Sequence, residues 1–218
     1  LLAMASFVSS VGICQTQEEF FPHLVFSPRD KQYNAFVSKK LLNHFKAMSE
    51  PSLFNLAKKN HTINTYRFLW LPSAEHPVCI RLTQTGRTFI LHVAGHDGFS
   101  GNEAGQLSLN KDIKLDPQQG RRLIALIEKT AFWSTPVEVK ESRGKGDGDG
   151  IVLEGANNGK YHIITRHGSA AGESYDAFCR AMLELAEEPT ALKRWDYFRE
   201  MERKSPDYRA EPPQTEDL

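Results

Sequence analysis

Two hydrophobic spacings alternate along the chain, and each predicts a different kind of element. Between Pro28 and Pro51, apolar side chains recur three or four positions apart, which is the spacing of one helix face; they are Tyr33, Phe36, Val37, Leu41, Phe45 and Met48. Ser27 followed by Pro28 is typical of an N-cap and the first helical position. The spacing therefore predicts a helix that begins at Pro28 and ends near Pro51, followed by a short turn of helix with Leu53 and Leu56.

From Thr65 onward the spacing changes to two. Apolar and polar residues alternate in three segments, 65–71, 78–83 and 89–93, and only short connections separate them. Alternation with short connections is typical of an antiparallel meander that has one face on the core. A loop rich in Gly, Asp and Asn follows at 95–105, and residues 106–109 are a candidate fourth strand.

Helical spacing returns in the later part of the chain. Asp116 and Pro117 are an N-cap and a first helical residue, and Gln119 stands at the capping-box position. Apolar residues at helical spacing predict another helix over 175–186, and a last, highly charged helix over 189–204. We expect these helices to bury their apolar stripes against one face of the sheet.

A hairpin separates the second helix from the third. Two alternating segments, 151–154 and 161–165, flank Asn157-Asn158-Gly159, which we interpret as a three-residue loop. Together the elements predict an α+β fold in which a mostly antiparallel sheet, the meander plus the C-terminal hairpin, packs against helices. The side chains expected in its core are Trp70, Leu82, Leu91, Ile127 and Phe178.

The two ends of the chain differ from the middle. Residues 1–14 carry no charge; they are too few to span a bilayer as a helix and have the length of the apolar core of a secretory signal. We therefore expect 1–14 to be the remnant of a signal peptide and the protein to be exported, periplasmic or secreted. A lipid anchor on Cys14 and a buried N-terminal element are the alternatives. Residues 15–188 then form the α+β domain, 189–204 a C-terminal charged helix and 205–218, without periodicity, a disordered tail.

Charge and cysteine content narrow the possible partners. Lys and Arg number 27 and Asp and Glu number 27, so the net charge is zero. No basic excess indicates a nucleic-acid partner, and no second apolar stretch approaches the length of a transmembrane span. Besides Cys14, the chain has Cys79 and Cys179, which either pair in an oxidising compartment or act as small apolar residues.

One set of polar positions suggests a binding surface. Arg67, Arg81 and His92 occupy polar positions of the three meander strands, and His162 and Arg166 occupy those of the hairpin. If all five strands join one sheet, these side chains share a face that is suited to a carboxylate, a phosphate or an acidic peptide. We therefore predict that this face binds another protein or a small anionic ligand. An ordinary exposed face, or one covered by the first helix, is the alternative.

A second hypothesis is catalytic. A three-residue loop places Glu154 directly opposite His162, and a carboxylate beside an imidazole can orient a general base. A loop one residue shorter or longer moves Glu154 to the other face, and a plain cross-strand ion pair is the simpler interpretation.

Other chemical motifs are weak or missing in the sequence. It contains no nucleophile elbow, no phosphate-binding loop and no Cys-x-x-Cys motif typical of zinc sites. Asp147 and Asp149 look like the start of a calcium loop, but the later ligands are missing, so a flexible linker is the better interpretation. We expect neither a cofactor nor a metal.

Several segments resemble a group of uncharacterised bacterial exported proteins. They are YRFLWL at 66–71, HPVCIRL at 76–82, FW at 132–133 and LEG…GKYH…R over 153–166. The group favours a Trp near Ile151, which this chain lacks. The resemblance implies a bacterial source and one framework for Arg67, Arg81, Glu154, His162 and Arg166, but it brings no known activity.

The sequence therefore favours an exported, non-enzymatic binding or protein-interaction module, of an inhibitor-like or immunity-like kind. Two alternatives stay open at this point: a small hydrolase that uses Glu154 and His162, and a structural protein of the cell envelope.

Overall fold

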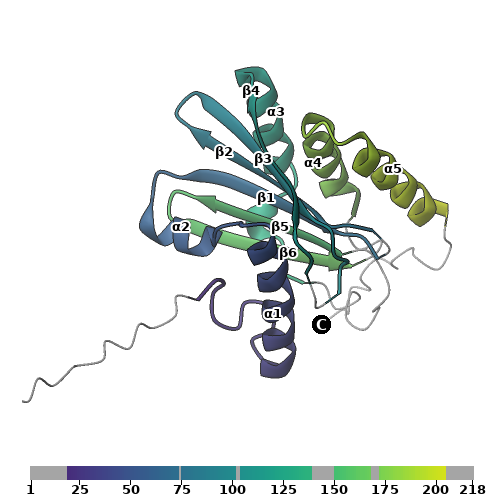
Figure 1. The fold of residues 1–218 in the computed structure, drawn as a ribbon. Coiled ribbons are helices and arrows are strands. Elements are labelled where there is room, and N and C mark those ends of the chain that lie inside the picture. Colours follow the sequence, from purple (N-terminus) through teal and green to yellow (C-terminus); the bar gives the residue numbers. More distant parts are fainter. Residues whose placement is uncertain (1–18, 74, 102–103, 139–149, 168–171, 205–218) are drawn as a thin grey trace, which may run out of the picture.

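The computed structural model describes residues 19–204 except 74, 102–103, 139–149 and 168–171 (Figure 1). Six strands within these residues form one antiparallel sheet in the order β4-β3-β2-β1-β5-β6. Their bounds are Asn64–Leu71 for β1, Val78–Thr85 for β2, Thr88–His96 for β3, Leu107–Leu115 for β4, Gly150–Asn157 for β5 and Lys160–His167 for β6. The predicted α+β fold, with a meander and a C-terminal hairpin in one antiparallel sheet, is confirmed.

Helices cover both faces of this sheet rather than one, as Figure 1 shows. On one face lie α1 (Lys31–Ala47) and α2 (Leu53–Lys59), and on the other lie α3 (Pro117–Glu128), α4 (Gly172–Leu185) and α5 (Pro189–Lys204). The expectation of a single covered face was wrong because both phases of the central strand β1 are apolar over much of its length. None of the helices in the described part of the chain has the length and apolar character that a membrane span requires.

Each face of the sheet has its own core. Tyr66, Phe68 and Trp70 of β1 pack with apolar residues of α3, α4 and α5, whereas Leu69 and Leu71 pack with α1 and with the segment before it. The five side chains predicted to form the core are at most 2% exposed, which confirms that prediction; they are Trp70, Leu82, Leu91, Ile127 and Phe178.

The last helix shares the larger core. Trp195 of α5 makes edge-to-face contacts with Phe68 and Trp70, at ring-centroid distances of 5.5 and 5.6 Å. The predicted charged helix over 189–204 therefore exists, and it packs on the sheet through its apolar stripe. The predicted signal remnant, 1–14, and the predicted tail, 205–218, lie outside the described residues.

The start of α1, the cap of α3 and the end of β4 are each predicted from local sequence signals. Helix α1 begins three residues later than Pro28 because Asp30 is its N-cap and accepts a hydrogen bond from the Tyr33 N–H at 2.9 Å. Asp116 and Gln119 form the predicted capping box of α3. Strand β4 ends at Leu115 rather than at the predicted Leu109. An edge strand can carry many polar residues, and these obscured the alternation of apolar and polar positions in the sequence.

The two described cysteines do not pair. Cys79 and Cys179 are both free and buried, and they belong to the cores on opposite faces of the sheet. Burial raises the pKa of each thiol well above its usual range. Both residues therefore act as small apolar side chains, which is the second of the two interpretations of the sequence.

The larger core makes a quantitative prediction. Leu91→Ala should lower the free energy of unfolding by about 2–5 kcal/mol, through lost apolar transfer and a residual cavity. Leu91 has no exposed surface, whereas Thr88 at the start of the same strand is exposed, so Thr88→Ala is the matched control. Urea denaturation measures both, and a loss below about 1 kcal/mol for Leu91→Ala would contradict the assignment of the core face.

Candidate functional site

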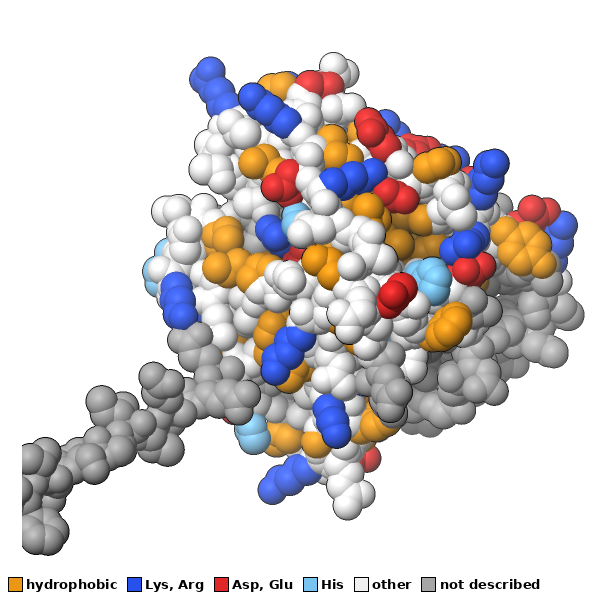
Figure 2. All heavy atoms as spheres, viewed as in Figure 1, with side chains coloured by type: hydrophobic (Ala, Val, Ile, Leu, Met, Phe, Trp, Pro, Cys, Tyr) orange, Lys and Arg blue, Asp and Glu red, His pale blue; other side chains and the backbone are white. Residues whose placement is uncertain are grey.

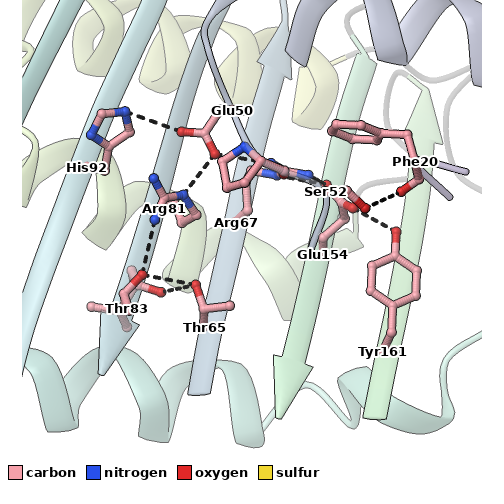
Figure 3. Close-up of polar contacts among 12 residues, drawn as sticks. Phe20, Glu50, Ser52, Thr65, Arg67, Arg81, Thr83, His92, Glu154 and Tyr161 are labelled. Carbon is pink, nitrogen blue, oxygen red and sulfur yellow. Dashed lines mark hydrogen bonds and ion pairs between the residues drawn. The ribbon is translucent and has the colours of Figure 1, made fainter. Parts of the chain in front are cut away.

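Five side chains from five adjacent strands form a straight row on the face that α1 and α2 share. Direct cross-strand pairing joins Asp112 to His92, His92 to Arg81, Arg81 to Arg67, and Arg67 to Glu154. Figure 3 shows the four members that lie on β3, β2, β1 and β5, aligned across the sheet. We call these five residues the polar row.

Two arginines of the polar row stand directly opposite each other, so two positive charges lie close together. Like charges in such pairs repel. Glu50, which lies over the row, compensates this repulsion with its negative charge. Its Oε2 accepts hydrogen bonds from NH1 of Arg67 at 3.0 Å and from Nε of Arg81 at 2.8 Å. One carboxylate therefore holds both guanidinium groups, as Figure 3 shows.

The connection between α1 and α2 places Glu50 in this position. Ser49 adopts a left-handed φ of 57°, and the Glu50 N–H donates to the carbonyl of Phe45 at 2.8 Å, which turns the chain at the end of α1. Ser52 then caps α2 by accepting from the Asn55 N–H at 3.1 Å. Two helix ends thus fix the backbone on either side of Glu50, so the carboxylate points down onto the sheet.

Arg67 is the most completely buried member of the row. Its Nε donates to Glu154 Oε2 at 2.8 Å, its NH2 donates to the same oxygen, and its NH1 also donates to the Pro51 carbonyl at 2.8 Å. The guanidinium carbon lies 3.8 Å from the centre of the Phe45 ring. Burial alone would lower the pKa of Arg67, but Glu154 and Glu50 raise it above its usual range. Arg67 is therefore a permanently charged framework residue that a ligand cannot reach.

Tyr161 closes the inner end of the network. Its hydroxyl donates to Glu154 Oε1 at 2.7 Å. Burial and the neighbouring Glu154 raise the pKa of Tyr161 well above its usual range, so it stays a donor. Each oxygen of the buried Glu154 side chain is thereby satisfied, one by Arg67 and one by Tyr161.

The outer end of the row reaches solvent. The side chains of Arg81 and His92 are 19% and 17% exposed, and that of Asp112 is 69% exposed. His92 stands between two carboxylates, with Nδ1 at 2.6 Å from Asp112 Oδ1 and Nε2 at 3.4 Å from Glu50 Oε1. A neutral imidazole has a single N–H, so it can donate to only one of the two. Glu50 Oε1 has no hydrogen-bond partner among the described residues.

The predicted pair of Glu154 and His162 does not exist. Asn158 and Gly159 form a two-residue turn, with positive φ values of 49° and 77°, so the loop is one residue shorter than predicted. Glu154 consequently faces Ile163, and His162 stands opposite Gly155, on the other face of the sheet. The one-residue difference moves every side chain of β6 to the opposite face.

On that opposite face, His162 and Arg166 have structural partners. His162 Nε2 lies 2.9 Å from the Thr135 carbonyl oxygen, and burial lowers the pKa of its ring. Arg166 donates from NH1 to the Val137 carbonyl at 3.0 Å and from NH2 to the Pro136 carbonyl at 2.9 Å. Both side chains hold the segment after α3 against β6.

Three of the five residues in the predicted binding set therefore form a spatial cluster. The structure brings together Arg67, Arg81, His92 and Glu154, and it separates His162 and Arg166 from them. Sequence reasoning missed three members of the network, Glu50, Tyr161 and Asp112. Glu50 lies in a connection between helices, where no periodic pattern reveals its position. Asp112 could have been predicted if β4 had been assigned its full length, and Tyr161 if the hairpin turn had been assigned correctly.

A second polar cluster joins α1 to the loop after β3. His44 and His96 stack with Nδ1 of His44 at 2.8 Å from Nε2 of His96. The Gly98 N–H donates to Nδ1 of His96 at 3.1 Å, so His96 carries its proton on Nε2 and donates to His44. His44 must then donate from Nε2 to the Gly101 carbonyl at 3.0 Å. This directed chain requires both rings to be neutral.

Neither cluster has the composition of a metal centre. In the part of the chain that the structure describes, no group of three or more His, Cys, Asp or Glu side chains is placed to hold a metal ion. Asp147 and Asp149 lie outside the described residues. A cavity of about 350 Å³ lies between α1 and residues 19–24, and its lining includes Phe20, Asn34 and Lys39 but neither His162 nor any residue of the polar row.

Comparison with known proteins adds no functional assignment. No protein-family model matches the chain, and no similar protein was found among curated sequences.

Burial should decide how much each carboxylate of the row contributes to stability. Glu154→Gln leaves Arg67 with less compensation in a fully buried site, so we expect a loss of about 3–5 kcal/mol in the free energy of unfolding. Asp112→Asn is the same chemical change at the exposed end of the row and should cost less than about 1 kcal/mol. Urea denaturation of both variants tests this prediction. Equal losses of unfolding free energy would show that the inner half of the row is no better shielded from water than its outer end.

The histidine pair makes the protein sensitive to acid. Burial, followed by the neighbouring His96, lowers the pKa of His44 from 6.5 to about 4. Between these values the unfolded chain binds a proton that the folded chain does not, so stability is complete above pH 6.5 and falls as the pH drops toward 4.

We expect this loss to be on the order of 3 kcal/mol. Denaturation curves at several pH values measure it, with His44→Gln as the control, because that variant should show a flatter dependence over the same window. If wild type and His44→Gln lose stability in parallel, other groups are responsible.

Proposed function

We propose that the chain is an exported, non-enzymatic module that binds another protein through the uncovered half of the sheet face that carries the polar row. We call this surface the outer face; its residues are Arg81, Thr83, Thr85, Ile90, His92, Asp112 and Lys114. The observation that supports it is the asymmetry of the row. Glu50, Arg67 and Glu154 are sealed beneath α1 and α2, whereas no described helix lies in front of the hairpin end of β2, β3 and β4 (Figure 1).

The chemistry of the outer face suits a protein better than a small anion. Arg81 and Lys114 are basic, Asp112 is acidic, and Ile90 is 41% exposed between them. Figure 2 likewise shows both charge signs and apolar side chains intermixed on this side of the molecule. A surface of mixed charge with an apolar centre resembles a protein interface, and the balanced net charge gives no electrostatic attraction for a polyanion.

Arg81 is the residue best placed to select a partner. Its Nε is held by Glu50 and its NH1 by Thr83 Oγ1 at 3.2 Å, whereas its NH2 has no hydrogen-bond partner among the described residues. The guanidinium is thus fixed in orientation and keeps one donor group for a carboxylate of the partner. Such preorganisation lowers the entropy that binding must overcome.

Export is part of the proposal because residues 1–14 are uncharged and apolar, as in a secretory signal. The hydrolase hypothesis is not retained, because Glu154 and His162 lie on opposite faces of the sheet.

Site-specific photo-crosslinking tests the proposal in the cells that make the protein. A photoreactive residue at Thr85 or Ile90 should give an adduct with a different protein, whereas one at Arg122, exposed on α3 behind the sheet, should not. Arg81→Ala should lower the adduct yield from Ile90, and Arg81→Lys should restore only part of it, because Lys keeps the charge but loses the planar fork.

Circular dichroism of each Arg81 variant confirms folding before yields are compared. Equal yields at Ile90 and Arg122, or adducts that Arg81→Ala leaves unchanged in a folded protein, would refute this surface as the binding site.

A further inference from the structure

The two edge strands of the sheet, β6 and β4, differ in whether another segment of the chain bonds to their outer edge. At the β6 edge, the Thr165 N–H donates to the Val137 carbonyl at 2.7 Å, and Arg166 bonds to the carbonyls of Pro136 and Val137. At the β4 edge, no described residue outside β3 forms a backbone hydrogen bond with Leu107–Leu115. A nine-residue edge strand without a cover is a template for another strand.

The turn between β2 and β3 shows which groups of β4 point outward. Gly86, with φ of 59°, and Arg87 form a two-residue turn closed by the pair Thr85 and Thr88. The residues flanking such a turn exchange both backbone hydrogen bonds, and the direction alternates along the strand. Leu91 therefore bonds to Ile113, its partner on β4, so the N–H and C=O groups of Asp112 and Lys114 face away from the sheet.

When two copies of β4 are paired with each other, one register places opposite charges next to each other. If two copies of β4 pair antiparallel with Ile113 at the centre, Asp112 of each copy stands opposite Lys114 of the other. If Asp112 or Lys114 is at the centre instead, that residue stands opposite its own copy and like charges meet. Lys111 does not disturb the favoured register, because its ammonium pairs with Glu188 of the same chain at 2.8 Å.

We propose that β4 is a self-association edge, which pairs with β4 of a second copy in the register centred on Ile113. Two outward-facing pairs, each of Asp112 with Lys114, then exchange backbone hydrogen bonds and join two six-stranded sheets into one. Ile113, half-buried in the monomer, packs against its own copy at the symmetry axis. This inference does not depend on the proposed function, since the partner there is a different protein on the face of the sheet.

Sedimentation velocity over a wide range of concentrations tests the proposal on the whole chain. The wild type should shift reversibly from monomer to dimer as concentration rises. Asp112→Lys alone and Lys114→Asp alone should each place like charges opposite each other and abolish the shift. The double variant D112K/K114D exchanges the two charges and should restore dimerisation. Arg122→Asp, an exposed change of the same kind on α3, should leave the dimer unchanged.

Circular dichroism and urea denaturation establish that each variant is folded, and either single variant suffices if the other fails to fold. A wild type that stays monomeric at every concentration would overturn the proposal. So would a dimer that the single variants do not affect, or one that the double variant does not restore. A heterologous adduct from Ile90 combined with a monomeric wild type would reject self-association and leave the proposed function intact.

Discussion

The pairing of Arg67 with Arg81 on neighbouring strands is the constraint on which the rest of the structure depends. Two guanidinium groups that are directly opposite each other, one of them fully buried, need negative charge between and beside them. Glu50 supplies it between them and Glu154 supplies it beside them. Because Glu50 belongs to the connection between α1 and α2, the position of both helices is tied to these two arginines.

The same network divides one face of the sheet into two halves with different properties. Where Glu50, Phe45 and Tyr161 close over Arg67 and Glu154, every charge is compensated inside the protein. Where the row continues to Arg81, His92 and Asp112, the side chains keep contact with water. The buried half fixes the orientation of the exposed half, so that a partner meets side chains that are already ordered.

Particular residues show what the sequence could and could not predict. The period of two identified β1, β2 and β3 and their polar positions, which correctly grouped Arg67, Arg81 and His92 because direct pairing in a meander follows from short turns. The hairpin prediction failed by one residue, because it counts Asn157 in the loop although Asn158-Gly159 is the dipeptide that two-residue turns prefer. The choice of loop length decides the face of Glu154 relative to His162. Glu50 and the pair of His44 and His96 could not be predicted, because tertiary packing of α1 on the sheet brings them together.

Arg67 also has a consequence for the order in which the molecule can assemble. Its partner Glu50 lies 17 residues earlier in the chain, but Glu154 lies 87 residues later. A growing polypeptide that ends before β5 has made the whole meander, yet it leaves this guanidinium on an open edge strand with only one of its two carboxylates. The centre of the sheet therefore gains its full stability only after β5 is inserted beside β1. Such a long loop closure slows folding and favours a single cooperative transition over a stable N-terminal intermediate.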